Sequence, residues 1–291
     1  MASSVFRLAR LPSPPAPLPC VPGPKLAPFT PNAEADIEFV EFLGRENDLD
    51  SLVMRGTPFY FCHSDSLLGG QGGDLTRPLA NSQLYADYFD PFNCECRAYG
   101  RLKEEKREDL AVKASGYLLL TPQQETDVAR RVTGRRHEQH RELPVRAIVK
   151  ELVARKAANP AQAPGMWADL QALHSLGIFV KDTHGGNYLG GKLVDFSRSW
   201  TMYHPAMEQI RASKLKDLML DELQQLLDHY YFWANSSAEP IAIPQDLKSF
   251  CSGHIDRYKD FPRAYNWLKW EKNADAAKAY VEQRLFDKAA H

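Results

Sequence analysis

The chain has 291 residues, of which 44% are hydrophobic and 25% charged, and its formal net charge is -1 at pH 7. This composition is typical of a water-soluble globular protein of one large or two moderate domains. A net charge so close to zero gives no basic field for nucleic acid, and no apolar run approaches the roughly 18 residues of a membrane span. The five cysteines contain no Cys-x-x-Cys pair, which favours a reducing, intracellular compartment over a disulfide scaffold.

The N-terminal segment is dense in proline. Residues 11–31 read LPSPPAPLPCVPGPKLAPFTP. Because proline fixes φ and lacks an amide donor, we predict a disordered, polyproline-type arm over residues 1–35. Two alternatives are a mitochondrial transit peptide, since the first eleven residues carry Arg7 and Arg10 but no acidic residue, and a ligand for an aromatic-lined proline groove.

Short strands are predicted after the arm, in the segments DIEFVEFLG, SLVMRG and TPFYFCH, and a glycine-rich loop follows at residues 67–78. Asp90-Pro91 then opens a predicted helix, FNCECRAYGRLKE, and GYLLLTP is predicted to be a buried strand. Amphipathic spacing predicts helices in VRAIVKELVARKAA, at residues 145–158, and in MWADLQALHSLG, at residues 166–177.

This order of elements favours an α+β fold. We predict a small β-rich lobe at residues 36–115 and a larger helical lobe at residues 116–291.

The segment with the clearest chemistry is LHSLGIFVKDTHGGNYLGGKLVDFSRSW, at residues 173–200. Asn187 lies five residues after Asp182, and Asp195 lies eight residues further on. The protein-kinase pattern D-x-x-x-x-N followed by D-F-G has the same internal spacing in the same helix–loop–hairpin context. Phosphoryl transfer needs one carboxylate as a base, and an amide oxygen and a second carboxylate as metal ligands.

These roles predict a two-lobed, protein-kinase-like fold. Asp182 would be the catalytic base if the protein is active, and Asn187 and Asp195 would bind Mg. Glu95, in the predicted helix, and Lys181 are assigned to cofactor binding. The cofactors would be ATP and Mg, or none if the fold is not catalytic.

The Asp182 segment has two other interpretations. Asp, Thr, Gly and Asn all favour turns, so DTHGGN could be an ordinary surface turn. D-x-H-G also occurs at metallophosphoesterase metal sites, but that chemistry needs further metal ligands on later strand ends. The histidines after Trp200 have no such strand context with a neighbouring aspartate.

The N-terminal half lacks several kinase features. No lysine occurs between Lys25 and Lys103, so no strand ahead of the helix can present a phosphate-binding lysine to Glu95. FLGREND contains Gly44 alone where a glycine-rich phosphate loop would need several glycines. We therefore expect weak or absent kinase activity, unless Arg55, His63 or Arg97 supplies the missing cation.

Taken together, DPFNCECRAYGRLKE, GYLLLTP and KDTHGGNYLGGKLVDFSRSWTMYHP resemble the fungal kinetochore family of the Fta-two subunit of the Sim-four complex. The resemblance covers residues 36–205. It implies a protein-kinase-like fold, nuclear residence at centromeres and a scaffold role among the other protein subunits of a kinetochore complex. A cytoplasmic location is the alternative, and we expect neither membrane association nor direct contact with nucleic acid.

Two functions follow from the sequence. The first is a pseudokinase that acts as a protein-interaction subunit in chromosome segregation. The second is an active, atypical ATP-dependent phosphotransferase that uses Asp182, Asn187 and Asp195 with Mg.

Overall fold

The structure is a computed structural model. It describes residues 18, 23–30, 38–42, 51–55, 59–63, 88–120, 145–151, 153, 160–202, 204, 207 and 212–236. The predicted glycine-rich loop at residues 67–78 lies outside the described residues.

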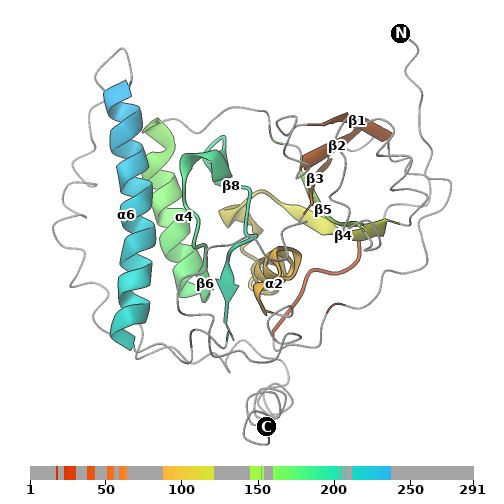
Figure 1. The fold of residues 1–291 in the computed structure, drawn as a ribbon, viewed down its shortest axis with the longest axis horizontal. Helices are drawn as coiled ribbons and strands as arrows, with labels where there is room; N and C mark the ends of the chain where they lie inside the picture. The colour runs from red at the N-terminus through yellow and green to blue at the C-terminus, as the bar shows by residue number, and fades with distance from the viewer. Residues whose placement is uncertain are drawn as a thin grey trace, which may run out of the picture.

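A five-stranded sheet forms one side of the molecule (Figure 1). Its strands are β1 (Glu38–Phe42), β2 (Ser51–Arg55), β3 (Phe59–His63), β4 (Ala114–Leu120) and β5 (Val145–Glu151). Their spatial order is β1-β2-β3-β5-β4, and all neighbouring strands are antiparallel. The strands predicted in the first three segments and in GYLLLTP are therefore confirmed, and β4 lies at an edge of the sheet.

The helix predicted at residues 145–158 is wrong. Val145–Glu151 is the strand β5, which pairs with β3 on one side and β4 on the other. The β-branched residues Val145, Ile148 and Val149 suit a pleated strand, and pairing along both edges outweighs the helical spacing of the segment.

The position of β4 and β5 also bears on the predicted lobes. The boundary between residues 115 and 116 falls inside β4, because that strand begins at Ala114, and the sheet continues to Glu151. Any sheet-based lobe would have to extend to Glu151. The division into two kinase lobes stays a prediction.

Helix α2 (Pro91–Glu104) begins as the sequence predicts. The Asp90 side chain accepts a hydrogen bond from the backbone N–H of Asn93 at 3.2 Å, and Pro91 occupies the first turn, where its missing N–H costs nothing. All residues from Phe92 to Leu102 are buried. A helix buried on every side is a central element of a core rather than a surface helix.

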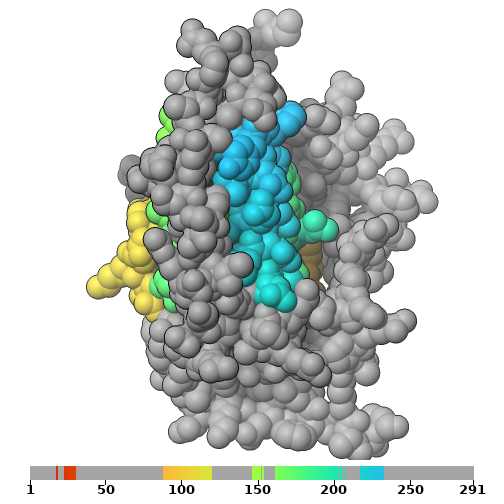
Figure 2. Space-filling model, turned by 90° about the vertical axis from the view of Figure 1, so that its left-hand side faces the viewer, coloured from red at the N-terminus to blue at the C-terminus, as the bar shows by residue number. Residues whose placement is uncertain are grey.

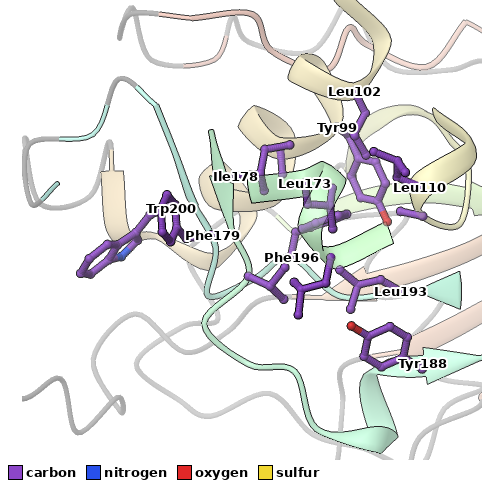
Figure 3. Packing of buried hydrophobic residues seen from close by; sticks show 14 of the residues in the cluster. Tyr99, Leu102, Leu110, Leu173, Ile178, Phe179, Tyr188, Leu193, Phe196 and Trp200 are labelled. Atoms are coloured by element: carbon purple, nitrogen blue, oxygen red, sulfur yellow. The ribbon is translucent and has the colours of Figure 1, made fainter. Parts of the chain in front are cut away.

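Different residues of α2 contact different parts of the chain. Arg97 and Arg101, one turn apart, donate to the backbone oxygens of Thr201 at 2.8 Å and Met202 at 2.7 Å. The Tyr99 ring meets Phe196 edge to face, with 5.1 Å between the ring centroids. Figure 3 shows these two rings within the apolar core, which also includes Leu102, Leu110, Leu173, Ile178, Phe179, Tyr188, Leu193 and Trp200.

Two helices lie on the far side of α2 from the sheet (Figure 1). Helix α4 (Ala163–Ser175), which the sequence predicted, packs against α6 (Ala212–Ser236). Figure 2 shows that α6 lies at the molecular surface. No helix among the described residues has the length and apolar character needed to cross a bilayer.

Four two-residue strands follow α4. They form two antiparallel pairs, β6 (Ile178–Phe179) with β9 (Trp200–Thr201), and β7 (Tyr188–Leu189) with β8 (Lys192–Leu193). The short helix η5 (Gly185–Asn187) precedes β7. Two further short helices are η2 (Glu108–Leu110) and η4 (Pro160–Gln162). The described residues thus combine helices with small sheets, as an α+β protein does.

Residues 23–30 depart from the predicted disorder of the arm. The backbone of Phe29 donates to Tyr117 of β4 at 2.9 Å, and Tyr117 donates to Ala27 at 3.1 Å. Leu26, with 1% of its surface exposed, lies in the core. Prolines exclude a regular ladder, but a short isolated bridge and one buried leucine suffice to order this segment. Most of the remaining arm lies outside the described residues.

Candidate functional site

The loop after β6 contains Asp182 and brings two predicted site residues together. The side-chain amide of Asn187 donates to the backbone oxygen of Asp182 at 3.0 Å. The backbone N–H of Val194 donates to the backbone oxygen of Asn187 at 2.9 Å, which holds the segment before Asp195 against the same loop. Asn187 therefore connects the parts of the chain that carry the two predicted acidic residues.

The carboxylate of Asp182 lies between two basic side chains. Its oxygens are 3.5 Å from Nε2 of His184 and 3.5 Å from Nη1 of Arg198. Nδ1 of His184 accepts the backbone N–H of Gly186 at 3.0 Å, so a neutral ring carries its hydrogen on Nε2, facing Asp182. About a quarter of the Asp182 side chain is exposed, so this carboxylate is accessible to solvent.

Asp195 makes a local contact. Its Oδ1 accepts the backbone N–H of Ser197 at 2.6 Å. Asp182, Asn187 and Asp195 offer the oxygen atoms that Mg prefers, so their donor chemistry fits such a cation. The described residues contain no group of three or more His, Cys, Asp or Glu side chains arranged to hold a metal.

A buried ion pair lies beside this loop. Nζ of Lys150, on β5, is 2.6 Å from Oε1 of Glu95, on α2, and both side chains are at most 2% exposed. Lys150 also donates to the backbone oxygen of Val194 at 2.7 Å, and Glu95 accepts the backbone N–H of Phe196 at 3.0 Å. The pair thus joins the sheet, the central helix and the chain on both sides of Asp195.

Burial dominates the electrostatics of this pair. Loss of solvent raises the pKa of Glu95, the Lys150 ammonium opposes that rise, and the nearby charge of Asp195 adds to it. A carboxylate in this position depends on its ammonium partner to stay ionised.

The inference that no lysine is available to Glu95 is therefore wrong. Lys150 comes from a strand that follows the helix in the sequence, not from one that precedes it. The helix predicted at residues 145–158 would place Lys150 among the exposed residues of a surface helix, where a lysine carries no functional signal. The signal was the β-branched run around it, which predicts a buried strand.

A second buried carboxylate, Glu222 of α6, holds the start of the Asp182 loop. Its two oxygens accept the backbone N–H groups of Val180 at 3.1 Å and Lys181 at 2.8 Å, and one of them lies 2.8 Å from Nε2 of His174. Its backbone oxygen accepts the Thr183 hydroxyl at 3.0 Å. Sequence reasoning missed Glu222, because one glutamate in a long charged helix carries no distinguishing pattern.

Lys181 points into an aromatic cluster. Its Nζ lies 3.7 Å from the ring centroid of Trp200, and burial lowers the pKa of its ammonium. Its φ of 66° is in the left-handed region, which non-glycine residues seldom adopt. The contacts of Glu222 with the backbone around Lys181 support this conformation.

Arg97 is one of three residues that could supply the cation missing from the strands ahead of α2. Arg97 is buried, donates to Thr201, and lies 4.6 Å from the ring centroid of Tyr88. The side chains of Arg55 and His63 lie outside the described residues. Lys150 is the basic residue that contacts Glu95.

Comparison with known proteins identifies a class of kinetochore complex subunits. The family model described as kinetochore Sim4 complex subunit FTA2 matches residues 14–200, which is more than half of the chain. The protein belongs to this family. No curated protein matches the chain closely enough to count as a relative. The family suggests a role in the kinetochore and a nuclear, centromeric location.

Proposed function

We propose that this protein is a non-catalytic, protein-kinase-like subunit of a kinetochore complex, which acts through contacts with other protein subunits at the centromere. Membership of the family supports the kinetochore role. The observation that carries the non-catalytic part is the burial of Lys150. A lysine that serves phosphate must have an ammonium that phosphate oxygens can reach.

The ion pair of Lys150 and Glu95 supports a kinase-like fold. In protein kinases a strand lysine pairs with a helix glutamate, and an aspartate that binds Mg lies nearby. Here Asp195 follows Val194, whose backbone oxygen Lys150 contacts. The residues thus correspond in type and neighbourhood, although the lysine comes from a different strand.

The same contacts argue against phosphoryl transfer. The Lys150 ammonium is shared between Glu95 and the Val194 oxygen, and its side chain is 1% exposed. These two contacts leave one N–H of the ammonium, and a phosphate oxygen would have to enter a desolvated place to reach it. The donor chemistry of Asp182, Asn187 and Asp195 fits Mg, but the 1% exposure of Lys150 closes it to the phosphates of ATP in this conformation.

An active phosphotransferase is the second candidate. The observation in its favour is the contact of Asn187 with the Asp182 backbone, together with the bond from the Val194 N–H to the Asn187 oxygen, which brings the residue before Asp195 to the same loop. In that case Asp182 would accept the proton of the acceptor hydroxyl, and Asn187 and Asp195 would hold the Mg of bound Mg-ATP.

Thermal melting with nucleotide separates the two candidates. We expect the same Tm for the wild-type protein in buffer, in Mg alone and in millimolar Mg-ATP. A nucleotide that binds would add about 2.7 kcal/mol at 100 times its Kd. A rise in Tm with Mg-ATP that Asp195→Ala abolishes, together with transfer of labelled phosphate, would replace our proposal with the phosphotransferase.

Affinity purification tests the interaction role. A tagged chain, expressed at its natural level, is expected to co-purify with other kinetochore subunits and to localise to centromeres. The double variant Asp182→Asn/Asp195→Asn should retain both properties, because the proposal assigns these carboxylates no catalytic task. Recovery without any kinetochore protein, or exclusion of the tagged chain from the nucleus, would contradict the proposal.

A further inference from the structure

Residues 23–30, which we call the strap, lie against two elements of the domain. The backbone N–H of Leu26 donates to the backbone oxygen of Cys96, on α2, at 2.8 Å. Three residues later, Phe29 donates to Tyr117 of β4. The strap thus connects the central helix to the edge strand of the sheet.

Two glycines permit this close approach. A Cβ atom added at Gly100 would lie 2.5 Å from Cα of Lys25, and one added at Gly116 would lie 2.5 Å from Cα of Phe29. Such contacts with backbone atoms cannot be relieved by turning a side chain. Gly100 lies one turn after Cys96, so its missing side chain leaves the Cys96 oxygen accessible to the strap.

The strap contacts α2 next to the residue that makes the buried ion pair. Cys96 follows Glu95, whose carboxylate receives Lys150 and the Phe196 amide. Two other contacts of α2, through Arg97 and Arg101, hold it to residues 201 and 202. Since the strap contributes a separate attachment of the helix, its loss would allow α2 to shift relative to β5.

We propose that the strap is a conformational device, which fixes α2 and thereby couples the proline-rich arm to the ion pair of Glu95 and Lys150. With the strap in place, the pair is closed and the Phe196 amide is bonded to Glu95. When the strap leaves α2 and β4, the pair loosens and the segment around Asp195 becomes more mobile. Docking of the arm through the strap would then regulate the conformation of the ion pair and of the segment around Asp195.

Gly100→Ala in the full-length protein tests this proposal. Limited trypsin digestion reports the strap, because trypsin cleaves after Lys25 and the next residue, Leu26, is buried while the strap is docked. Hydrogen exchange of the Phe196 amide reports the ion pair. We expect the rate of cleavage after Lys25 and the exchange rate of the Phe196 amide each to rise about tenfold. This factor corresponds to about 1.4 kcal/mol of local opening. Gly165→Ala is the matched control, because a Cβ at this helical position meets nothing within 4 Å, and both rates should stay at the wild-type values.

A second variant covers the case in which Gly100→Ala does not fold. Leu26→Ala removes the buried side chain of the strap and leaves its backbone space intact, and it should move both rates in the same direction. Rapid cleavage after Lys25 in the wild-type protein would overturn the docked strap. Faster cleavage with an unchanged Phe196 amide, in either variant, would overturn the coupling.

Discussion

Two charged clusters, the pair of Lys150 with Glu95 and the surroundings of Asp182, differ most in their exposure to water. Lys150 and Glu95 are desolvated and bonded to the backbone on both sides of Asp195. Asp182, by contrast, is partly exposed and lies 3.5 Å from each of its basic neighbours. The first arrangement connects three parts of the fold, and the second leaves a carboxylate in contact with solvent.

The difference shows that residues of the types used in phosphoryl transfer can lie in very different environments. The chain has a lysine, a glutamate, two aspartates and an asparagine of the kind that phosphoryl transfer uses. Lys150 and Glu95 are buried in the interior of the domain, whereas Asp182 is partly exposed. The variants below test that division, beginning with the largest expected effect.

Removing the ammonium of the buried pair should have the largest effect. Lys150→Met leaves the Glu95 carboxylate desolvated without its partner, which should cost about 3–5 kcal/mol of unfolding free energy. Chemical denaturation with urea measures this loss. A change below about 1 kcal/mol, the range of exposed ion pairs, would contradict the burial of the pair.

Glu222→Gln should have the next largest effect. The substitution removes the charge that receives the Val180 and Lys181 amides and should cost about 1.5–3 kcal/mol, the worth of hydrogen bonds to a charged group. Denaturation gives the stability, and hydrogen exchange at these two amides gives the local effect. Asp221→Asn makes the same chemical change at the neighbouring exposed position and should leave both measurements unchanged.

His204 should contribute to unfolding at acid pH. Burial lowers its pKa well below the ordinary value of 6.5, helped by the charges of Arg97 and Lys181, while a bond to the Tyr88 oxygen opposes the shift. At a pH below the ordinary value, His204 therefore binds a proton in the unfolded chain but stays neutral in the folded protein. Stability is then fully present above the ordinary value and is lost as the pH falls below it, by about 1.4 kcal/mol per pH unit at most.

His204→Phe isolates this contribution. Phenylalanine can keep the stacking on Trp200, whose ring centroid is 5.1 Å away, but it does not titrate. Urea denaturation at several pH values between about 5 and about 7, around the titration range of histidine, should give a shallower pH dependence for the variant. Equal slopes for the two proteins would mean that folding does not lower the pKa of His204.

The smallest effect is expected at Lys192. Its ammonium lies 2.7 Å from Asp169 and donates to the backbone oxygen of Asp109, but 44% of the side chain is exposed. Lys192→Met should therefore cost only about 0–1 kcal/mol in urea denaturation. It also serves as the matched control for Lys150→Met. If the two substitutions cost the same, burial is not what distinguishes the clusters.

Much of the local structure could be predicted from the sequence. The Asp90-Pro91 start of α2 and the strands around residues 38–63 follow from capping and alternation, which act within a few residues. The neighbourhood of Asp182 and Asn187 follows from a motif in which spacing is tied to a local loop.

What could not be predicted depends on contacts between distant residues. Val145–Glu151 becomes a strand because two other strands flank it, and Lys150 becomes a buried partner only as a consequence. The strap is ordered by space at Gly100 and Gly116 that no proline-rich composition reveals. Glu222 acquires its role from a loop some 40 residues earlier, as its separations of 42 and 41 residues from Val180 and Lys181 show.

A double-mutant cycle of unfolding free energies tests most directly whether the buried pair acts as a structural connection. The cycle compares the wild-type protein with Lys150→Met, Glu95→Met and the double variant. We predict that each single variant loses about 3–5 kcal/mol, while the double variant loses much less than their sum, because no charge is then left buried without a partner. Losses that simply add would contradict the account, since they would mean that the two side chains do not depend on each other.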